Sequence, residues 1–224
     1  MGLSSGTMPR VCSRRASISR RGRPITSQGK ALVAEMVDWA RSAGFQVVAA
    51  GKGTKYLPAY HQSTPDTVWQ HYGLSAEDAQ RGGMNAQMFN SFLDGTKSAI
   101  EMAAVANATG LLPAPGGLNF PPCGVDDLAR VLRPASAGGQ LHHRGQVEVI
   151  SSIERDGRPV FRDLRWGVYV VFRAGTDYVR NCFSEYGLVT DDSGWKVCLC
   201  SEMADSEYSG EHYAQADRDE DQHC

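Results

Sequence analysis

An alanine-rich segment that ends at a glycine is the strongest local constraint on how this chain of 224 residues can fold. In the second half of residues 89–110, small or apolar residues recur at helical spacing, and Gly110 stands where a helix C-terminal cap belongs. These apolar positions are Ala99, Ile100, Met102, Ala103, Ala106 and Ala108. We therefore expect a helix that ends at Gly110, with a neighbouring element packed closely on its alanines.

Polar residues stand where this helix is expected to begin. Asp94 and Lys97 are three residues apart, so their side chains share one face if the helix has begun by Asp94. With Gly95 and Thr96 between them, they supply an acid, a flexible backbone, a hydroxyl and an amine, which together could bind a polar substrate. The alternative, which this segment alone favours, is structural: Asp94 caps the helix and Lys97 lies in solvent.

The rest of the pattern predicts an α+β fold derived from α/β proteins. Residues 28–42 have apolar positions on one helical face, and residues 45–50 form a short apolar run typical of a buried strand. A helix followed by a buried strand indicates an α/β layer with a parallel sheet. Further strands are expected at 146–152 and 168–173, and further helices at 125–132 and 176–186.

Two lysines follow the first predicted strand. Gly51, Lys52 and Gly53 are expected to close it, and the carboxyl ends of strands are where ligands bind in open α/β sheets. Lys52 and Lys55, beside flexible glycines, could bind a phosphate or carboxylate, and one of them, partly desolvated, could donate a proton. The alternative is two solvated loop lysines, which is the commoner fate of this residue type.

Composition excludes several classes of partner. The formal net charge of -2 and the pI near 6.3 give no reason to expect nucleic acid or an anionic membrane. No apolar run is long enough to span a bilayer. The six cysteines form no C-x-x-C pair, which indicates reduced thiols in a cytoplasmic protein. Cys198 and Cys200 with His223 and Cys224 could hold a metal in principle, but we expect none, because that segment looks unfolded.

The two ends differ in composition from the middle. Residues 1–30 are rich in Arg and Ser and contain no acid, which indicates a disordered or non-native segment, with a transit peptide as the alternative. Residues 198–224 are acidic and are expected to be a disordered tail, with Trp195 as the last core residue. The folded body is expected to consist of a main domain at 31–134 and a small α+β unit at 135–197.

Several segments of this body resemble the homoserine dehydrogenase superfamily, and most closely its branch of oxidoreductases similar to deoxyxylulose phosphate reductoisomerase-like (DRL) enzymes, which carry a C-terminal SAF-type domain. The resemblance covers about residues 31–194. It is carried by Ala50-Gly-Lys-Gly-Thr-Lys55, Ser63-Thr-Pro-Asp66, Gly83-Met-Asn-Ala-Gln-Met88, Phe92-Leu-Asp-Gly-Thr-Lys97, Glu101-Met-Ala-Ala and Ala106-Asn-Ala-Thr-Gly110.

This resemblance implies the catalytic domain of a Rossmann-type, NAD(P)-dependent oxidoreductase with a small polar or phosphorylated substrate. The best-understood relatives convert deoxyxylulose phosphate to methylerythritol phosphate in isoprenoid precursor synthesis. By the resemblance, Lys52 is a proton shuttle or a ligand of a substrate oxygen, and Lys97 and Asp94 hold polar oxygens of the substrate. Lys55 would bind an anionic group. Residues 31–134 would be the catalytic and substrate domain, and 135–197 part of the SAF-type unit.

The chain also departs from this family. Gly51 replaces an Asn, and no G-x-G-x-x-G turn is present, so the intact family's NAD(P)H is not expected to bind to this chain. We hypothesise a truncated or frame-disrupted copy that is inactive alone, which reading the coding DNA in its other frames would test. The alternative function is a non-catalytic binding or oligomerisation module, and a homo-oligomer is left open.

Overall fold

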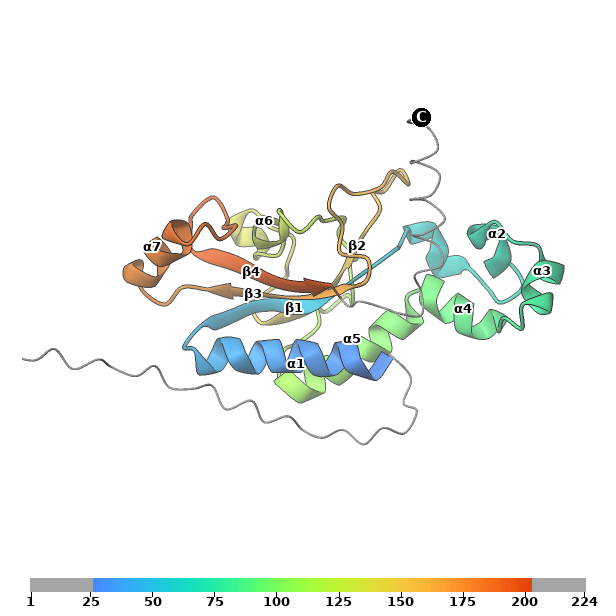
Figure 1. Cartoon of the computed structure of the whole chain (residues 1–224), viewed down its shortest axis with the longest axis horizontal. Coiled ribbons are helices and arrows are strands. Elements are labelled where there is room, and N and C mark those ends of the chain that lie inside the picture. The colour runs from blue at the N-terminus through green and yellow to red at the C-terminus, as the bar shows by residue number, and fades with distance from the viewer. Residues whose placement is uncertain (1–25, 203–224) are drawn as a thin grey trace, which may run out of the picture.

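The computed structural model describes residues 26–202, with a run of short and long helices between the first strand and the later ones (Figure 1). Of the segments expected at 1–30 and 198–224, residues 1–25 and 203–224 lie outside the described residues, whereas residues 26–30 belong to a helix. The elements in chain order are α1 (Thr26–Ser42), β1 (Gln46–Thr54), the 3-10 helix η1 (Pro58–Gln62), α2 (Val68–Tyr72), α3 (Ala76–Arg81), α4 (Ala86–Leu93), α5 (Thr96–Thr109), α6 (Leu128–Val131), the 3-10 helix η2 (Ala135–Ala137), β2 (Gln146–Ser151), β3 (Gly167–Arg173), α7 (Asp177–Glu185) and β4 (Lys196–Glu202).

The four strands form one mixed sheet in the order β2-β1-β3-β4. β1 runs parallel to β2, whereas β3 is antiparallel to both of its neighbours. The predicted α+β class is confirmed, but the expected parallel sheet holds only for the β1–β2 pair. α1 and α5 cover one face of the sheet and α6 lies on the other (Figure 1).

The helix α5 forms as predicted and ends at Gly110, whose left-handed φ of 70° suits a glycine. The face that it buries differs from the expected one. The buried side chains of α5 are Ser98, Glu101, Met102, Val105 and Thr109, while most of its alanines are exposed. The apolar positions at helical spacing predicted the wrong buried face of α5, because the face that packs on the core includes the polar residues Ser98, Glu101 and Thr109.

The strand β1 continues through the residues that were expected to close it. Gly51 and Gly53 lie inside the strand: Gly51 pairs with both β2 and β3, and Gly53 pairs with β2. A Cβ added to Gly51 would lie 1.8 Å from the carbonyl oxygen of Glu148, and one added to Gly53 would lie 1.7 Å from that of Leu164. The close approach of backbone explains both glycines.

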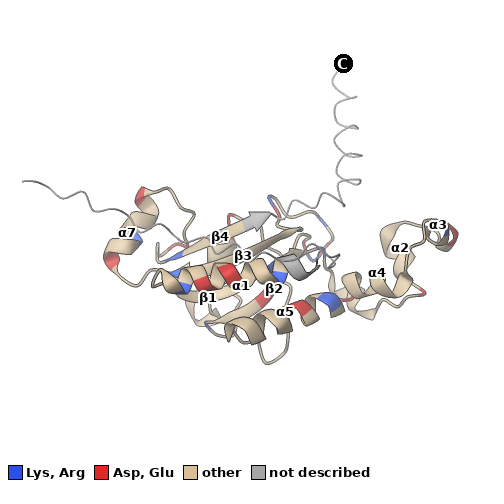
Figure 2. Cartoon of the chain, turned by 60° about the horizontal axis from the view of Figure 1, so that its bottom comes forward, with Lys and Arg blue, Asp and Glu red and all other residues tan. Residues whose placement is uncertain are grey.

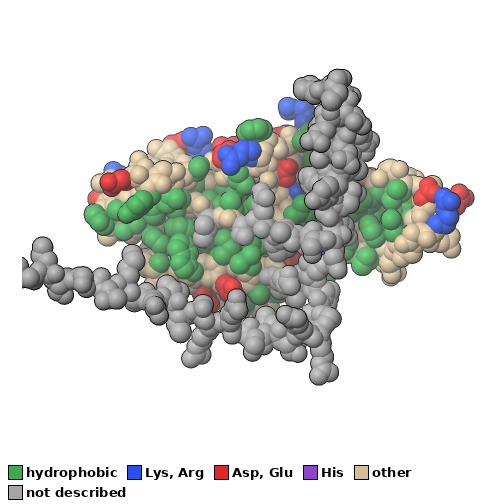
Figure 3. Space-filling model, in the orientation of Figure 1, with side chains coloured by type: hydrophobic (Ala, Val, Ile, Leu, Met, Phe, Trp, Pro, Cys, Tyr) green, Lys and Arg blue, Asp and Glu red, His purple; other side chains and the backbone are tan. Residues whose placement is uncertain are grey.

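The helices α2, α3 and α4 form a lobe that extends beyond the end of the sheet (Figure 1). Its small core includes Val68 and Trp69 of α2, both of which are buried. Ser75 caps α3 by accepting a hydrogen bond from the Asp78 amide. Hydrophobic side chains are visible on the surface of this lobe and over α7, where Tyr178 is 78% exposed (Figure 3).

The last strand corrects the expected C-terminal boundary. β4 covers residues 196–202 and pairs along β3, so the segment expected to be a tail from residue 198 is a strand up to residue 202. Val197 is only 1% exposed, so the core extends beyond Trp195, which was expected to be its last residue. Moreover, the units expected at 31–134 and 135–197 share one sheet, since β1 pairs with both β2 and β3.

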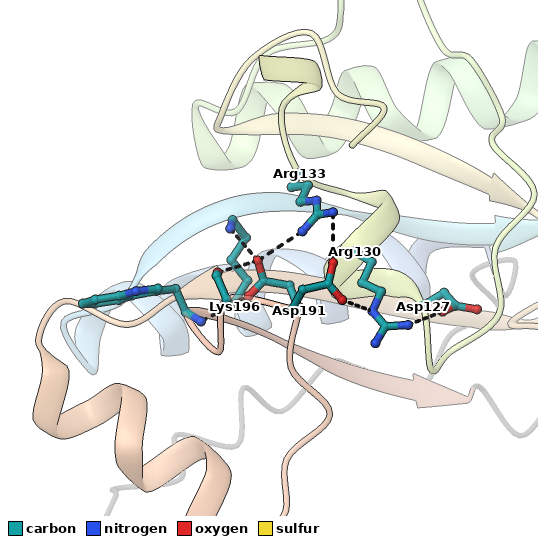
Figure 4. Close-up of polar contacts among 8 residues, drawn as sticks. Asp127, Arg130, Arg133, Asp191 and Lys196 are labelled. Carbon is teal, nitrogen blue, oxygen red and sulfur yellow. Dashed lines mark hydrogen bonds and ion pairs between the residues drawn. The ribbon is translucent and has the colours of Figure 1, made fainter. Parts of the chain in front are cut away.

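A buried ion-pair cluster fixes the turn before β4 (Figure 4). The Asp191 side chain is fully buried and accepts a hydrogen bond of 2.8 Å from the Lys196 ammonium, while Arg133 approaches it from the segment after α6 at 3.6 Å. Asp191 also accepts hydrogen bonds from the backbone amides of Trp195 and Lys196. Buried charges are stable only when they are paired in this way. The cluster therefore attaches the α7–β4 connection to the sheet.

This cluster makes a pH-dependent contribution to stability. Burial by itself would raise the pKa of Asp191, but the hydrogen bonds from Lys196 and Ser193 outweigh it and lower the pKa below its usual 3.8. A lowered native pKa stabilises the fold above the unfolded value, and this contribution is lost as the pH falls through the native value. We expect the stability difference between wild type and Asp191→Asn, measured by urea unfolding, to be smaller at pH 3 than at pH 6.

The matched control for this titration is Asp192→Asn. Asp192 is the next residue, but its side chain is 60% exposed, and it pairs with Arg130 and with the outer side of Arg133. Exposed pairs contribute little to stability. The interpretation would be wrong if the effect of Asp191→Asn were equal at the two pH values, or if Asp192→Asn reproduced it.

Candidate functional site

Lys52 leaves the sheet on the face that α5 covers. Its neighbours Gly51 and Gly53 lie against backbone on the opposite face, because side chains alternate along a strand. The Lys52 ammonium forms an ion pair with the carboxylate of Glu101 on α5. The Lys52 side chain is 20% exposed and that of Glu101 is 8% exposed. The strand thus presents a partly desolvated ammonium group to the buried side of α5.

An open pocket lies beside this ion pair. Its lining combines two lysines, an acid, a hydroxyl and an apolar side chain from three helices. These residues are Lys30 of α1, Ser91 of α4, and Lys97, Ile100 and Glu101 of α5. Figure 2 shows acidic and basic positions close together on the first turns of α5. Glu101 lines the pocket together with Lys97 and also binds Lys52, so it lies between the two lysines that the sequence analysis had named as site candidates.

Lys97 reaches the pocket from the first turn of α5. It precedes Glu101 by four residues, a spacing that places two side chains on the same helical face. Its ammonium nitrogen also lies 4.0 Å from the centroid of the Phe92 ring, a cation–π distance. This lysine therefore lines a pocket, in contrast to a helix-surface lysine that extends into bulk water.

Asp94 is turned toward the protein. Its carboxylate accepts hydrogen bonds from the Thr96 amide at 2.8 Å and from the Asn90 side chain at 3.0 Å. His61 Nδ1 lies 3.2 Å from the carbonyl oxygen of Asp94. These contacts are those of a residue that fixes the start of α5 and its connection to α4. The structure thus places Lys97 in the lining of the pocket, while Lys52 reaches only the lining residue Glu101 and Asp94 bonds to residues at the start of α5.

Lys55 lies just beyond β1 and is exposed, and it is not among the pocket-lining residues.

Two residues of the site were missed by the sequence analysis. Glu101 carried a detectable signal, since it follows Lys97 by one helical turn. Lys30 carried none, because only the packing of α1 against α5 brings it to the pocket.

Four helix N-termini within residues 26–202 are not open to the pyrophosphate of NAD(P)H. That group needs a glycine-rich turn and free amides at a helix N-terminus. In this structure β1 leads into the 3-10 helix η1. The N-terminal amides of four helices are engaged by side chains of the chain itself: Ser75, Asn85, Asp94 and Thr176 accept from them. A dinucleotide cofactor therefore finds no cradle at these helix N-termini.

Neither a group of three metal ligands nor a membrane-spanning helix is found within residues 26–202. Between residues 26 and 202, no group of three or more His, Cys, Asp or Glu is arranged to hold a metal ion. His223 and Cys224, which the sequence analysis considered as ligands, lie outside the described residues. None of the helices in residues 26–202 combines the length and the apolar character needed to cross a bilayer.

The mixed sheet holds a strand lysine against a carboxylate of α5, and the same carboxylate lines a pocket with two further lysines. Residues 30–201 match the family described as "Oxidoreductase DRL, catalytic domain". The match covers most of the chain, so the chain belongs to this family and carries an oxidoreductase catalytic domain. No curated protein was found to match the chain.

Proposed function

We propose that this chain is the substrate-binding and catalytic portion of an NAD(P)-dependent oxidoreductase that acts on a small polar or phosphorylated substrate. Deoxyxylulose phosphate, which would become methylerythritol phosphate in isoprenoid precursor synthesis, is the first candidate. The observation that carries the proposal is the Lys52–Glu101 ion pair at a pocket lined by two further lysines. Ammonium groups are well suited to phosphate and carboxylate groups, which they bind as point charges.

Each residue has a separate role in this proposal. Lys52 contacts a substrate oxygen, and Lys97 with Lys30 attracts the anionic end of the substrate into the pocket. Asp94 holds the first turn of α5, so that Lys97 keeps its position. Lys55 is a second candidate for an anionic group, at the exposed end of β1.

The cofactor of this proposal is bound by a nucleotide-binding domain that does not belong to residues 26–202. The engaged helix N-termini of the described part support this separation. The same observation favours the second candidate function, a substrate-binding module without chemistry of its own. Titration of the chain with NADPH tests both candidates. Saturable binding would show that this chain binds the cofactor itself and would contradict a separate nucleotide-binding domain.

The substrate part of the proposal predicts the effect of Lys52→Met on binding. We expect the chain to bind deoxyxylulose phosphate in a calorimetric titration, and Lys52→Met to weaken this binding about tenfold to a hundredfold. A hydrogen bond to a charged group contributes about 1.5–3 kcal/mol, which corresponds to such a change.

Glu35→Gln is the control for a general effect of charge, since Glu35 is an exposed residue of α1. Its binding should equal that of the wild type. Absence of saturable binding, or equal binding by wild type and Lys52→Met, would remove Lys52 from the substrate site.

A further inference from the structure

Two cysteines lie close together on the last strand, away from the candidate site. Cys198 and Cys200 are two positions apart in β4, so their side chains point to the same face of the sheet. Cys198 packs against the hydrophobic cluster that contains Leu128 of α6, so this is the face on which α6 lies (Figure 1). The sequence analysis set these cysteines aside because their segment looked unfolded, and its place in β4 removes that reason.

The two thiols are in contact with each other. The Cys198 thiol shares a weak hydrogen bond with the Cys200 thiol. This hydrogen bond and burial raise the pKa of Cys198 well above its usual 9.0. Cys198 is half-buried, whereas Cys200 is exposed. The pair can therefore be reached from solvent through Cys200, and its sulfur atoms stay protonated until a cation with a high affinity for sulfur displaces the protons.

The spacing of the pair suits an inserted ion better than a disulfide. A strand rises about 3.4 Å per residue, so the Cα atoms of residues two positions apart are separated by about 6.8 Å. This separation is at the upper end of the range that disulfides span, about 4.4–6.8 Å. Two thiolates on opposite sides of a metal ion lie about 4.6 Å apart, since a zinc–thiolate bond measures about 2.3 Å. Thiols that are already in contact need little movement to reach that separation.

We propose that Cys198 and Cys200 form a binding site for one Cu(I) ion, a site that does not depend on the proposed function. Thiolates are soft ligands, which favour Cu(I), and two of them satisfy its coordination. Structural Zn²⁺ requires four ligands, and no group of three or more His, Cys, Asp or Glu in residues 26–202 is placed to hold a metal ion. On binding, each thiol releases its proton, two copper–sulfur bonds form, and the copper keeps its oxidation state.

Competition with the Cu(I) chelator bicinchoninate, under anaerobic conditions, tests the site. The reference chain carries Cys12→Ser and Cys224→Ser, because those cysteines lie outside the described residues and would compete for the ion. We expect this chain to bind one Cu(I). Cys200→Ser, at an exposed position, should weaken binding at least about a hundredfold, since loss of a residue that only supports a metal ligand already costs about 10–100-fold. Affinity should rise with pH, because binding releases protons.

Cys182→Ser is the matched control. Cys182 is a half-buried cysteine on a different element, α7, and its replacement should leave the Cu(I) affinity unchanged. X-ray absorption of the copper-loaded reference chain should show two sulfur ligands. The inference fails if the reference chain takes no Cu(I) from the chelator, if Cys200→Ser binds it as tightly as the reference chain, if Cys182→Ser weakens binding equally, or if fewer than two sulfur ligands are found.

Discussion

Gly51→Ala is expected to destabilise the fold by more than about 3 kcal/mol and to prevent folding at 37 °C. The new Cβ would lie 1.8 Å from the carbonyl oxygen of Glu148 and 3.0 Å from the Tyr169 hydroxyl. The first contact is with backbone, so it can be relieved only by separating β1 from β2. Chemical denaturation followed by circular dichroism measures the change in the free energy of unfolding.

Gly116→Ala is the matched control for this experiment. Gly116 is exposed, and an added Cβ would meet no atom within 4 Å, so its stability should stay within about 0.5 kcal/mol of wild type. An Asn at position 51, the residue of the related sequences, would meet the same carbonyl as Ala. A Gly51→Ala chain as stable as wild type would show that β1 does not pair with β2 as described.

Asp191→Ala is expected to cost about 3–5 kcal/mol at neutral pH. The substitution leaves the Lys196 ammonium, whose side chain is 10% exposed, and the Arg133 guanidinium, whose side chain is 16% exposed, without this shared carboxylate. It also removes the acceptor of the Trp195 and Lys196 amides. Unpaired buried charge and lost backbone hydrogen bonds act in the same direction.

The effect of Asp191→Ala should be local to the C-terminal strand at first. Hydrogen exchange should speed up in β4, which the cluster attaches to the sheet, before it does in β1 and β2. Asp192→Ala, which removes an exposed carboxylate that pairs with Arg130 and Arg133, should change the free energy of unfolding by no more than about 1 kcal/mol. Equal effects of the two substitutions would show that burial of Asp191 does not determine its contribution.

Local sequence patterns predicted most of the regular elements. The apolar face of residues 28–42 predicted α1, whose Val33 and Val37 are buried, and Gly110 marked the end of α5. The β-branched runs of β2 and β3 were equally clear. These features depend on interactions between residues close in sequence, so a short window contains the information that determines them.

Other features of the fold depend on partners far along the chain. Gly51 and Gly53 looked like the end of a strand, and only the carbonyls of Glu148 and Leu164 reveal why a strand interior needs them. β4 looked like the start of an acidic tail, yet its pairing with β3 makes residues 196–202 a strand. No local pattern reports such pairing, because strand partners are separated by loops of any length.

The same division applies to the candidate site. The sequence alone determined which side chains can carry chemistry, among them Lys52, Lys97 and the acid at position 94. The tertiary structure alone decided that Glu101 binds Lys52, that Lys30 joins Lys97 at the pocket, and that the Asp94 carboxylate is used at the start of α5. The physical reason is that the chemical type of a group is local. Its partners and its burial arise only when α1, α5 and β1 pack together.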